Sequence, residues 1–120
     1  MDKINIEVEV INWLNTKLGV AWPVSGDKPK DNQAQYVLVD RTGGPREAMV
    51  LDQAEILIEV YHKTSRLTAS DKAQEIGDAI TELLLVENIT RAKVNSIVKL
   101  DDNIAQYYRY QIYCDVFGRR

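Results

Sequence analysis

Two strand-like segments separated by a Gly-Gly break constrain the fold of this chain most strongly. The first covers residues 35–41 and runs into Gly43-Gly44, and the second covers residues 55–63 with apolar side chains at every second position. Such alternation is typical of a strand with one buried face in an antiparallel sheet. We therefore expect two strands joined by a long β-hairpin excursion over Gly43–Asp52.

Two other segments have the spacing of amphipathic helices. Residues 3–18 place apolar side chains three and four positions apart and are followed by Gly19, a residue favoured just after a helix. The second helix is expected to begin at Thr68 as N-cap, with Asp71 three positions later completing a capping box. Its buried stripe contains small residues, including Gly77, which suit a helix that lies flat on strands.

Three further extended segments complete the expected order of elements. Residues 20–24 form a short piece whose proline suits a sheet edge, and residues 92–100 and 106–117 alternate in polarity. Asp101–Asn103 is expected to form the turn between the last two strands. The prediction is one α+β domain over residues 1–120, with two layers, a mixed or mostly antiparallel sheet and two helices on one face.

The sheet face away from the helices is expected to present tyrosines, an arginine and carboxylates. The residues of this parity are Glu55, Leu57, Glu59, Tyr61, Tyr107, Arg109, Gln111 and Tyr113. Tyrosine and arginine are enriched in protein interfaces. We predict that four of these residues meet a neighbouring subunit, namely Glu59, Tyr61, Arg109 and Tyr113. Tyr108 and Tyr110 are expected in the core.

No combination of side chains in the sequence predicts catalysis. His62, the only histidine, ends a strand and has no nearby serine or cysteine in a matching motif. Cys114 has the core-facing parity, where a free cysteine packs as a small apolar side chain. Asp101-Asp102 lacks the ligand spacing of a cation-binding loop, and Gly43-Gly44-Pro45 lacks the context of a phosphate-binding loop. We expect a protein that is not an enzyme and has no metal or cofactor site.

Composition narrows the possible partners. The net charge is −3 and the lysines and arginines are scattered, which argues against a general nucleic-acid binder. No apolar run approaches the roughly 20 residues of a membrane span, and no signal peptide is expected at the N-terminus. A single cysteine excludes an internal disulfide and is typical of a protein made in a reducing cytosol.

Five features together resemble a known family. They are Trp13-Leu14 at the end of the first helix, Thr42-Gly43-Gly44, the strand Ile56–Tyr61, the helix stripe from Ala69 to Leu83, and Arg109-Tyr110 in the last strand. In this arrangement the chain resembles the tail-terminator, or tail-completion, proteins of long-tailed bacteriophages and prophages. The resemblance covers nearly the whole chain as a pattern of elements.

The resemblance implies a structural virion protein. Members of the family form hexameric rings that cap the tail tube, end its polymerisation and present the surface that the head–tail connector joins. It implies a location in the tail-neck region of the virion after synthesis in the host bacterial cytoplasm, with DNA passing through the ring without specific binding. The residues expected to contact the tail or another partner from the excursion are Gly43, Gly44, Arg46, Glu47 and Met49.

Two alternative functions are open from the sequence. Another neck or head–tail connector ring protein would share every feature above and differ only in its partner. A small-ligand-binding α+β domain of ferredoxin-like character is the second alternative, and it would need a deep pocket lined by convergent polar groups.

Overall fold

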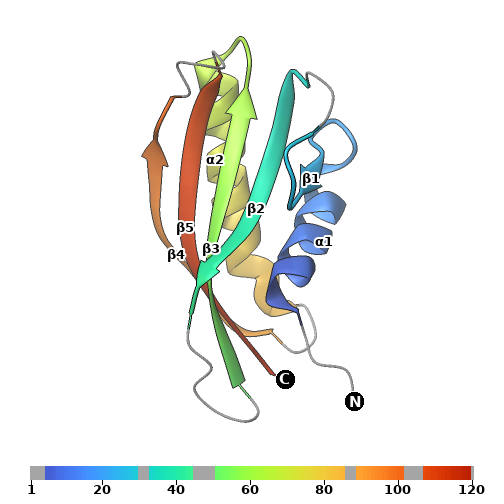
Figure 1. Cartoon of the computed structure of the whole chain (residues 1–120), viewed down its shortest axis with the longest axis vertical. Helices are drawn as coiled ribbons and strands as arrows, with labels where there is room; N and C mark the ends of the chain where they lie inside the picture. Colours follow the sequence, from blue (N-terminus) through green and yellow to red (C-terminus); the bar gives the residue numbers. More distant parts are fainter. Residues whose placement is uncertain (1–4, 30–32, 45–50, 86–88, 102–106, 120) are drawn as a thin grey trace.

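The computed structural model describes residues 5–29, 33–44, 51–85, 89–101 and 107–119. Within these residues, two α-helices and one short 3-10 helix accompany a five-stranded sheet (Figure 1). The elements are α1 (Ile6–Leu18), β1 (Val24–Ser25), β2 (Gln35–Gly43), β3 (Leu51–His62), α2 (Arg66–Thr81), η1 (Glu82–Leu85), β4 (Ile89–Lys99) and β5 (Tyr108–Arg119).

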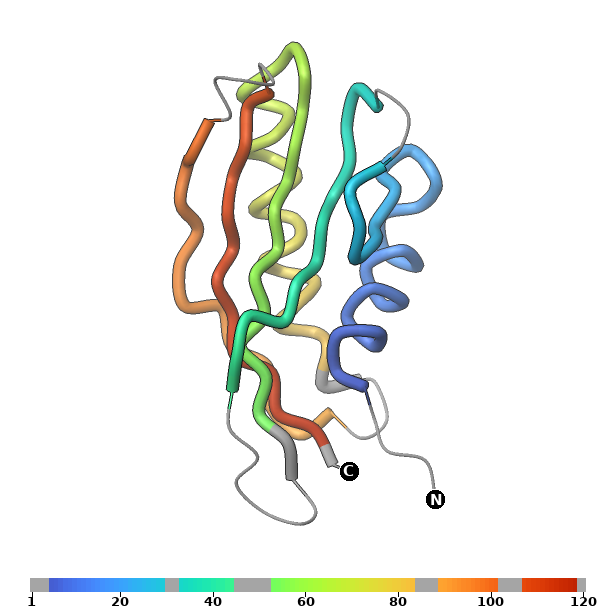
Figure 2. Tube along the Cα trace, viewed as in Figure 1, coloured from blue at the N-terminus to red at the C-terminus, as the bar shows by residue number. Residues whose placement is uncertain are grey.

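The sheet is mixed, with strand order β1-β2-β3-β5-β4. β1 runs parallel to β2, and the other neighbours are antiparallel. Figures 1 and 2 show α2 behind the strands and α1 beside β1 and β2, and one buried core joins both helices to the same face of the sheet. The predicted two-layer α+β fold is therefore confirmed.

The two helices share one core with the sheet. The inward side chains of β3 and β5 alternate with outward ones, as the sequence predicted, and those of α1 recur at helical spacing. Trp13 also joins the helices directly, because its indole Nε1–H donates to the Ala79 carbonyl oxygen at 2.7 Å. The largest fully buried side chains are Ile6, Leu14, Ile56, Ile58, Ile76, Ile80, Leu83 and Ile112.

The β2–β3 hairpin is longer than the sequence predicted. β3 begins at Leu51, because the antiparallel pairing with β5 continues beyond the alternating apolar segment. The register of β2 against β3 shifts between Arg41 and Gly43. Gly44 has a φ of 111°, and a Cβ there would lie 2.2 Å from the Gln53 carbonyl oxygen, so glycine is required at this position. Residues 45–50, with the predicted contact residues Arg46, Glu47 and Met49, lie outside the described residues.

The predicted N-cap of the second helix is wrong. α2 begins at Arg66, and its N-cap is Ser65, whose Oγ accepts a hydrogen bond from the Thr68 backbone N–H at 3.1 Å. The physical reason lies in the preceding turn. His62 Nδ1 accepts hydrogen bonds from the backbone N–H groups of Thr64 (3.2 Å) and Ser65 (3.0 Å), which fixes the chain before the helix. Thr68 then falls inside the first turn.

The expected core position of Tyr108 is also wrong. Tyr110 is buried, whereas the Tyr108 side chain is 37% exposed. Tyr108 is the first residue of β5 and pairs with His62, the last residue of β3. Parity alone therefore does not bury a side chain at the very end of the sheet.

The assignment of Ser65 as the N-cap of α2 can be tested directly. Replacement of Ser65 by alanine should lower the free energy of unfolding by about 1 kcal/mol, because the Thr68 N–H loses its acceptor. Thr68→Ala is the matched control and should change it by less than about 0.5 kcal/mol, since the Thr68 side chain is exposed. Urea denaturation of the two variants measures both values. A larger loss of unfolding free energy in Thr68→Ala than in Ser65→Ala would instead identify Thr68 as the N-cap.

Candidate interaction face of the sheet

The sheet face opposite the helices is the candidate functional site, and we call it the open face. In the part of the chain that the structure describes, both α-helices pack on the other face, where they share one core with the inward side chains of the strands. Leu57 and Glu59 of β3 stand on the open face opposite Tyr113 and Gln111 of β5, because these pairs are in register. The open face therefore combines aromatic, aliphatic and charged side chains, as the sequence predicted.

A hydrogen-bonded network crosses the middle of the open face. The Arg109 guanidinium lies 3.4 Å from Glu59 Oε2 and donates to the Tyr61 hydroxyl at 3.3 Å. Gln111 Nε2 donates to the same Glu59 oxygen at 3.1 Å, and the Tyr113 hydroxyl donates to Gln111 Oε1 at 2.9 Å. Arg109 Nε also donates to the Leu100 carbonyl oxygen at 2.8 Å. The structure therefore joins all four predicted interface residues through one network.

A cluster of three tyrosines closes one end of the open face. Tyr36 and Tyr61 are stacked with ring centroids 4.6 Å apart, and Tyr107 packs edge-on against both at 5.6 and 5.8 Å. The Tyr107 hydroxyl donates to the Gln33 carbonyl oxygen at 2.5 Å. Burial raises the pKa of Tyr61, and the hydrogen bond from Arg109 partly opposes this effect. The cluster could not be predicted from the sequence, because it depends on the pairing of Tyr36 with Tyr61 across β2 and β3.

The four predicted interface residues differ in the surface that they offer. Tyr61 is only 6% exposed, because Tyr36 and Tyr107 cover it within the same chain. Tyr113 is 41% exposed. The contact of all four residues with a neighbouring subunit stays a prediction. Of Tyr61 and Tyr113, Tyr113 offers the larger accessible surface.

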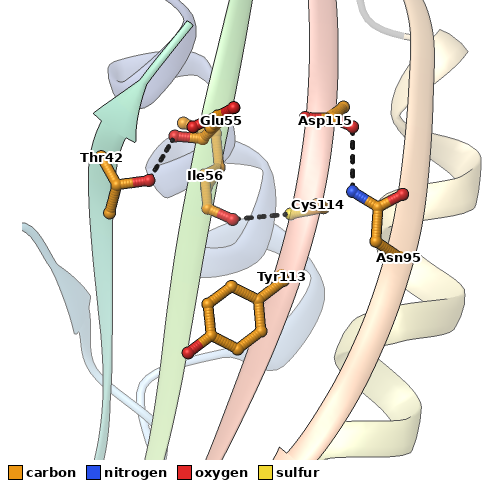
Figure 3. A pocket seen from close by; sticks show the side chains of 7 residues that line it. All are labelled: Thr42, Glu55, Ile56, Asn95, Tyr113, Cys114 and Asp115. Atoms are coloured by element: carbon orange, nitrogen blue, oxygen red, sulfur yellow. Dashed lines mark hydrogen bonds between the residues drawn. The ribbon is translucent and has the colours of Figure 1, made fainter.

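A shallow groove of about 360 Å³ lies beside Tyr113 on the open face. Its polar lining comes from four strands, β2 to β5, as Figure 3 shows. Thr42 Oγ1 donates to the Glu55 carbonyl oxygen at 3.3 Å, and Asn95 Nδ2 donates to Asp115 Oδ2 at 2.9 Å. Glu55 and Asp115 stand directly opposite each other on β3 and β5. Like charges in such a pair are unfavourable. Only the register of the sheet brings these residues together, so the linear sequence did not reveal the groove.

Cys114 borders the groove from the core side and is unsuited to act as a nucleophile. Its side chain is 2% exposed, and its thiol donates to the Ile56 carbonyl oxygen at 3.4 Å (Figure 3). Burial, with a smaller contribution from the charge of Asp115, raises the pKa of Cys114 to about 12. The reactive species of cysteine is the thiolate, so this residue is protonated and unreactive at neutral pH. Its predicted place in the core is confirmed.

The other candidates for chemistry have structural partners. His62 Nδ1 accepts two backbone hydrogen bonds, so the proton of the neutral ring lies on Nε2. The His62 ring also packs 5.9 Å from that of Trp22. Asp101 pairs with Lys99 at 3.1 Å, and Asp102 lies outside the described residues.

The described residues contain neither a metal-binding cluster nor a membrane-spanning helix. Among them, no group of three or more histidine, cysteine, aspartate or glutamate side chains is arranged to hold a metal ion. None of the helices in the described ranges has the length and apolar character needed to cross a membrane.

Comparison with known proteins adds a likeness of fold. No protein-family model matches this chain, and no curated protein matches its sequence. Its structure is similar to a chain of a solved structure described as the virion of a native gene transfer agent (GTA) particle, with a TM-score of 0.70 and 15% sequence identity. The match covers 96% of this chain and 95% of the other. At this identity the likeness establishes a shared fold.

The raised pKa of Cys114 predicts how stability depends on pH. The folded state retains the thiol proton up to about pH 12, whereas the unfolded chain loses it above the ordinary value of 9.0. Rising pH therefore favours the unfolded state, and this group lowers the free energy of unfolding by about 1.4 kcal/mol per pH unit between about pH 9.5 and 11.5.

Cys114→Ala tests this dependence, because it removes the thiol and leaves the other titrating groups in place. Its free energy of unfolding, measured by urea denaturation at a series of pH values, should fall less steeply with pH than that of the unmodified protein. Equal slopes would show that the Cys114 thiol does not titrate differently in the two states.

Proposed function

We propose that this chain is a structural, non-enzymatic protein of a phage-like virion, and specifically a tail terminator. In this function six copies form a ring on the end of the tail tube, stop its growth and present the surface that the head–tail connector joins. The ring would lie in the tail-neck region of the virion.

The structural likeness to a chain of a virion particle carries the proposal. It extends over 96% of this chain, so the shared fold includes both the helical layer and the sheet. Fold alone does not determine function, and the open face supplies the second support. A surface with an exposed tyrosine beside internally bonded polar groups has the composition of a protein interface.

The proposal assigns two regions to assembly. The open face around Tyr113 would meet a neighbouring subunit, since Tyr113 is 41% exposed and its hydroxyl is oriented by Gln111. The end of the β2–β3 hairpin, at Gly43 and Gly44, would approach the tail tube. Six copies at −3 each would carry a charge of −18, which disfavours a lasting grip on the DNA that passes through the ring.

Removal of the gene from the phage or prophage that encodes it tests the tail-terminator function. Electron microscopy should then show tail tubes of uncontrolled length, because no ring stops their polymerisation. Complementation with the unmodified chain should restore a single tail length. Tails of normal length that fail to join heads would contradict the terminator function and favour a connector ring.

A single substitution tests the open face in ring assembly. Tyr113→Asp should convert rings to monomers, because it removes the aromatic ring from the subunit contact and adds a negative charge near Glu55 and Asp115, while the melting temperature of the monomer changes little. Leu67→Asp is the matched control. Leu67 is 63% exposed on α2, away from the open face, so rings should survive that change. Native mass spectrometry measures the oligomeric state, and rings that persist in Tyr113→Asp would remove the open face from the subunit interface.

A further inference from the structure

The two edges of the sheet differ in how their backbone groups are satisfied. At the β1 edge, Asn15 of α1 imitates a neighbouring strand: its Nδ2 donates to the Val24 carbonyl oxygen at 3.0 Å, and its Oδ1 accepts from the Val24 N–H at 3.2 Å. Beyond β1, Glu7 Oε2 accepts from the Arg41 N–H of β2 at 3.3 Å. Side chains of α1 therefore occupy this edge.

The opposite edge is formed by β4, whose one neighbouring strand within the described ranges is β5 (Figures 1 and 2). The Leu100 N–H donates to the Arg109 carbonyl oxygen at 2.8 Å, and the register continues without interruption from Lys99↔Tyr110 to Ser96↔Tyr113. In an antiparallel ladder, inward and outward backbone groups alternate. The N–H and C=O groups of Ile97 and Lys99 therefore point away from β5. Among the described residues, no hydrogen bond to these outward groups is found.

The charge of β4 distinguishes between possible partners. Between Ile89 and Lys99 the sequence contains Arg91, Lys93 and Lys99 and no carboxylate. Two copies of β4 aligned antiparallel would bring cations together in many registers, and like charges across strands are destabilising. The register shifts near Arg91 and near Asn95 also interrupt pairing in the first half of the strand. The regular portion that remains is Ser96–Lys99.

Apolar surface accompanies this regular portion. The side chains of Val98 and Leu100 stand on the open face and are 44% and 47% exposed. An added strand with alternating side chains could cover them with its apolar face, while its acidic residues on the other face approach Lys99, which has the parity of Tyr110. The Lys99 ammonium is partly exposed, and Asp101, at 3.1 Å, is its carboxylate partner within the described ranges.

We propose that the outer edge of β4 between Ser96 and Lys99 is a docking site for an extended, acidic segment of a partner protein. The segment would add a sixth strand to the sheet, with main-chain hydrogen bonds to Ile97 and Lys99 and an ion pair to the Lys99 ammonium. This docking site is tested separately from the proposed ring, because it depends on the outward backbone groups of Ile97 and Lys99, whereas the ring is tested through the Tyr113 side chain.

Titration with two synthetic peptides, followed by amide NMR spectra, tests the docking site. The probe is a blocked eight-residue peptide of alternating valine and glutamate, and the control replaces glutamate by lysine. With the acidic peptide, the amides of Ile97 and Lys99 should shift and gain protection from hydrogen exchange, and binding should weaken as salt is raised. The lysine peptide should leave them unchanged.

Variants of Lys99 separate the backbone contribution from the charge. Lys99→Ala keeps the outward N–H and should weaken binding of the acidic peptide modestly. Lys99→Pro also removes the N–H, which an edge strand tolerates, and should weaken it by roughly a further tenfold. If the proline variant does not fold, Lys99→Glu replaces it and should reverse the preference between the two peptides.

Three results would overturn the docking site. They are no change at Ile97 and Lys99 with millimolar acidic peptide, equal binding of both peptides, or changes confined to the β1 edge. Self-association of the protein that protects Ile97 and Lys99, detected by sedimentation, would replace the acidic partner with a second copy of the chain. None of these results bears on ring assembly, which the Tyr113 variant tests separately.

Discussion

The pairing of β3 with β5 is the interaction on which the rest of the structure depends. The two strands are in continuous antiparallel register from Leu51↔Arg119 to His62↔Tyr108 in the centre of the sheet. This register buries one set of side chains under the helices and aligns the other set on the open face. The Glu59–Gln111 hydrogen bond and the facing carboxylates of the groove follow from that single alignment. A slip of one residue would exchange the two faces.

The parts of the fold predicted from sequence were those determined by local periodicity. Strand alternation correctly separated the buried and open faces at Ile58 and Glu59, and the two helices and the α+β class followed from spacing. The N-cap of α2 was missed because His62, a residue of the preceding strand, fixes the turn before Ser65. The capping rule for Thr68 uses only local sequence and contains no information on that contact. Tyr108 was misplaced because parity does not report where the sheet ends.

The candidate site was predicted only in part, for a related reason. Glu59, Tyr61, Arg109 and Tyr113 were placed on one face by parity, and the structure connects them. The cover that Tyr36 and Tyr107 provide for Tyr61 arises from residues far apart in the sequence, so its burial could not be predicted from any single strand. The groove at Glu55 and Asp115 likewise exists only after β3 and β5 have paired. The periodicity of a strand predicts on which face of the sheet a side chain lies, whereas its neighbours on adjacent strands depend on the register.

The amide of Asn15, which satisfies both backbone groups of Val24, limits how far such a sheet can propagate. Runaway polymerisation by strand addition requires every molecule to offer two free edges, one to receive a neighbour and one to pass the pattern on. Here the Asn15 side chain already occupies the backbone groups of Val24 at the β1 edge. A molecule of this fold can accept a strand at β4, but the next molecule finds no matching edge at β1. The sheet can therefore remain open to a partner on one side without carrying the risk of fibre growth.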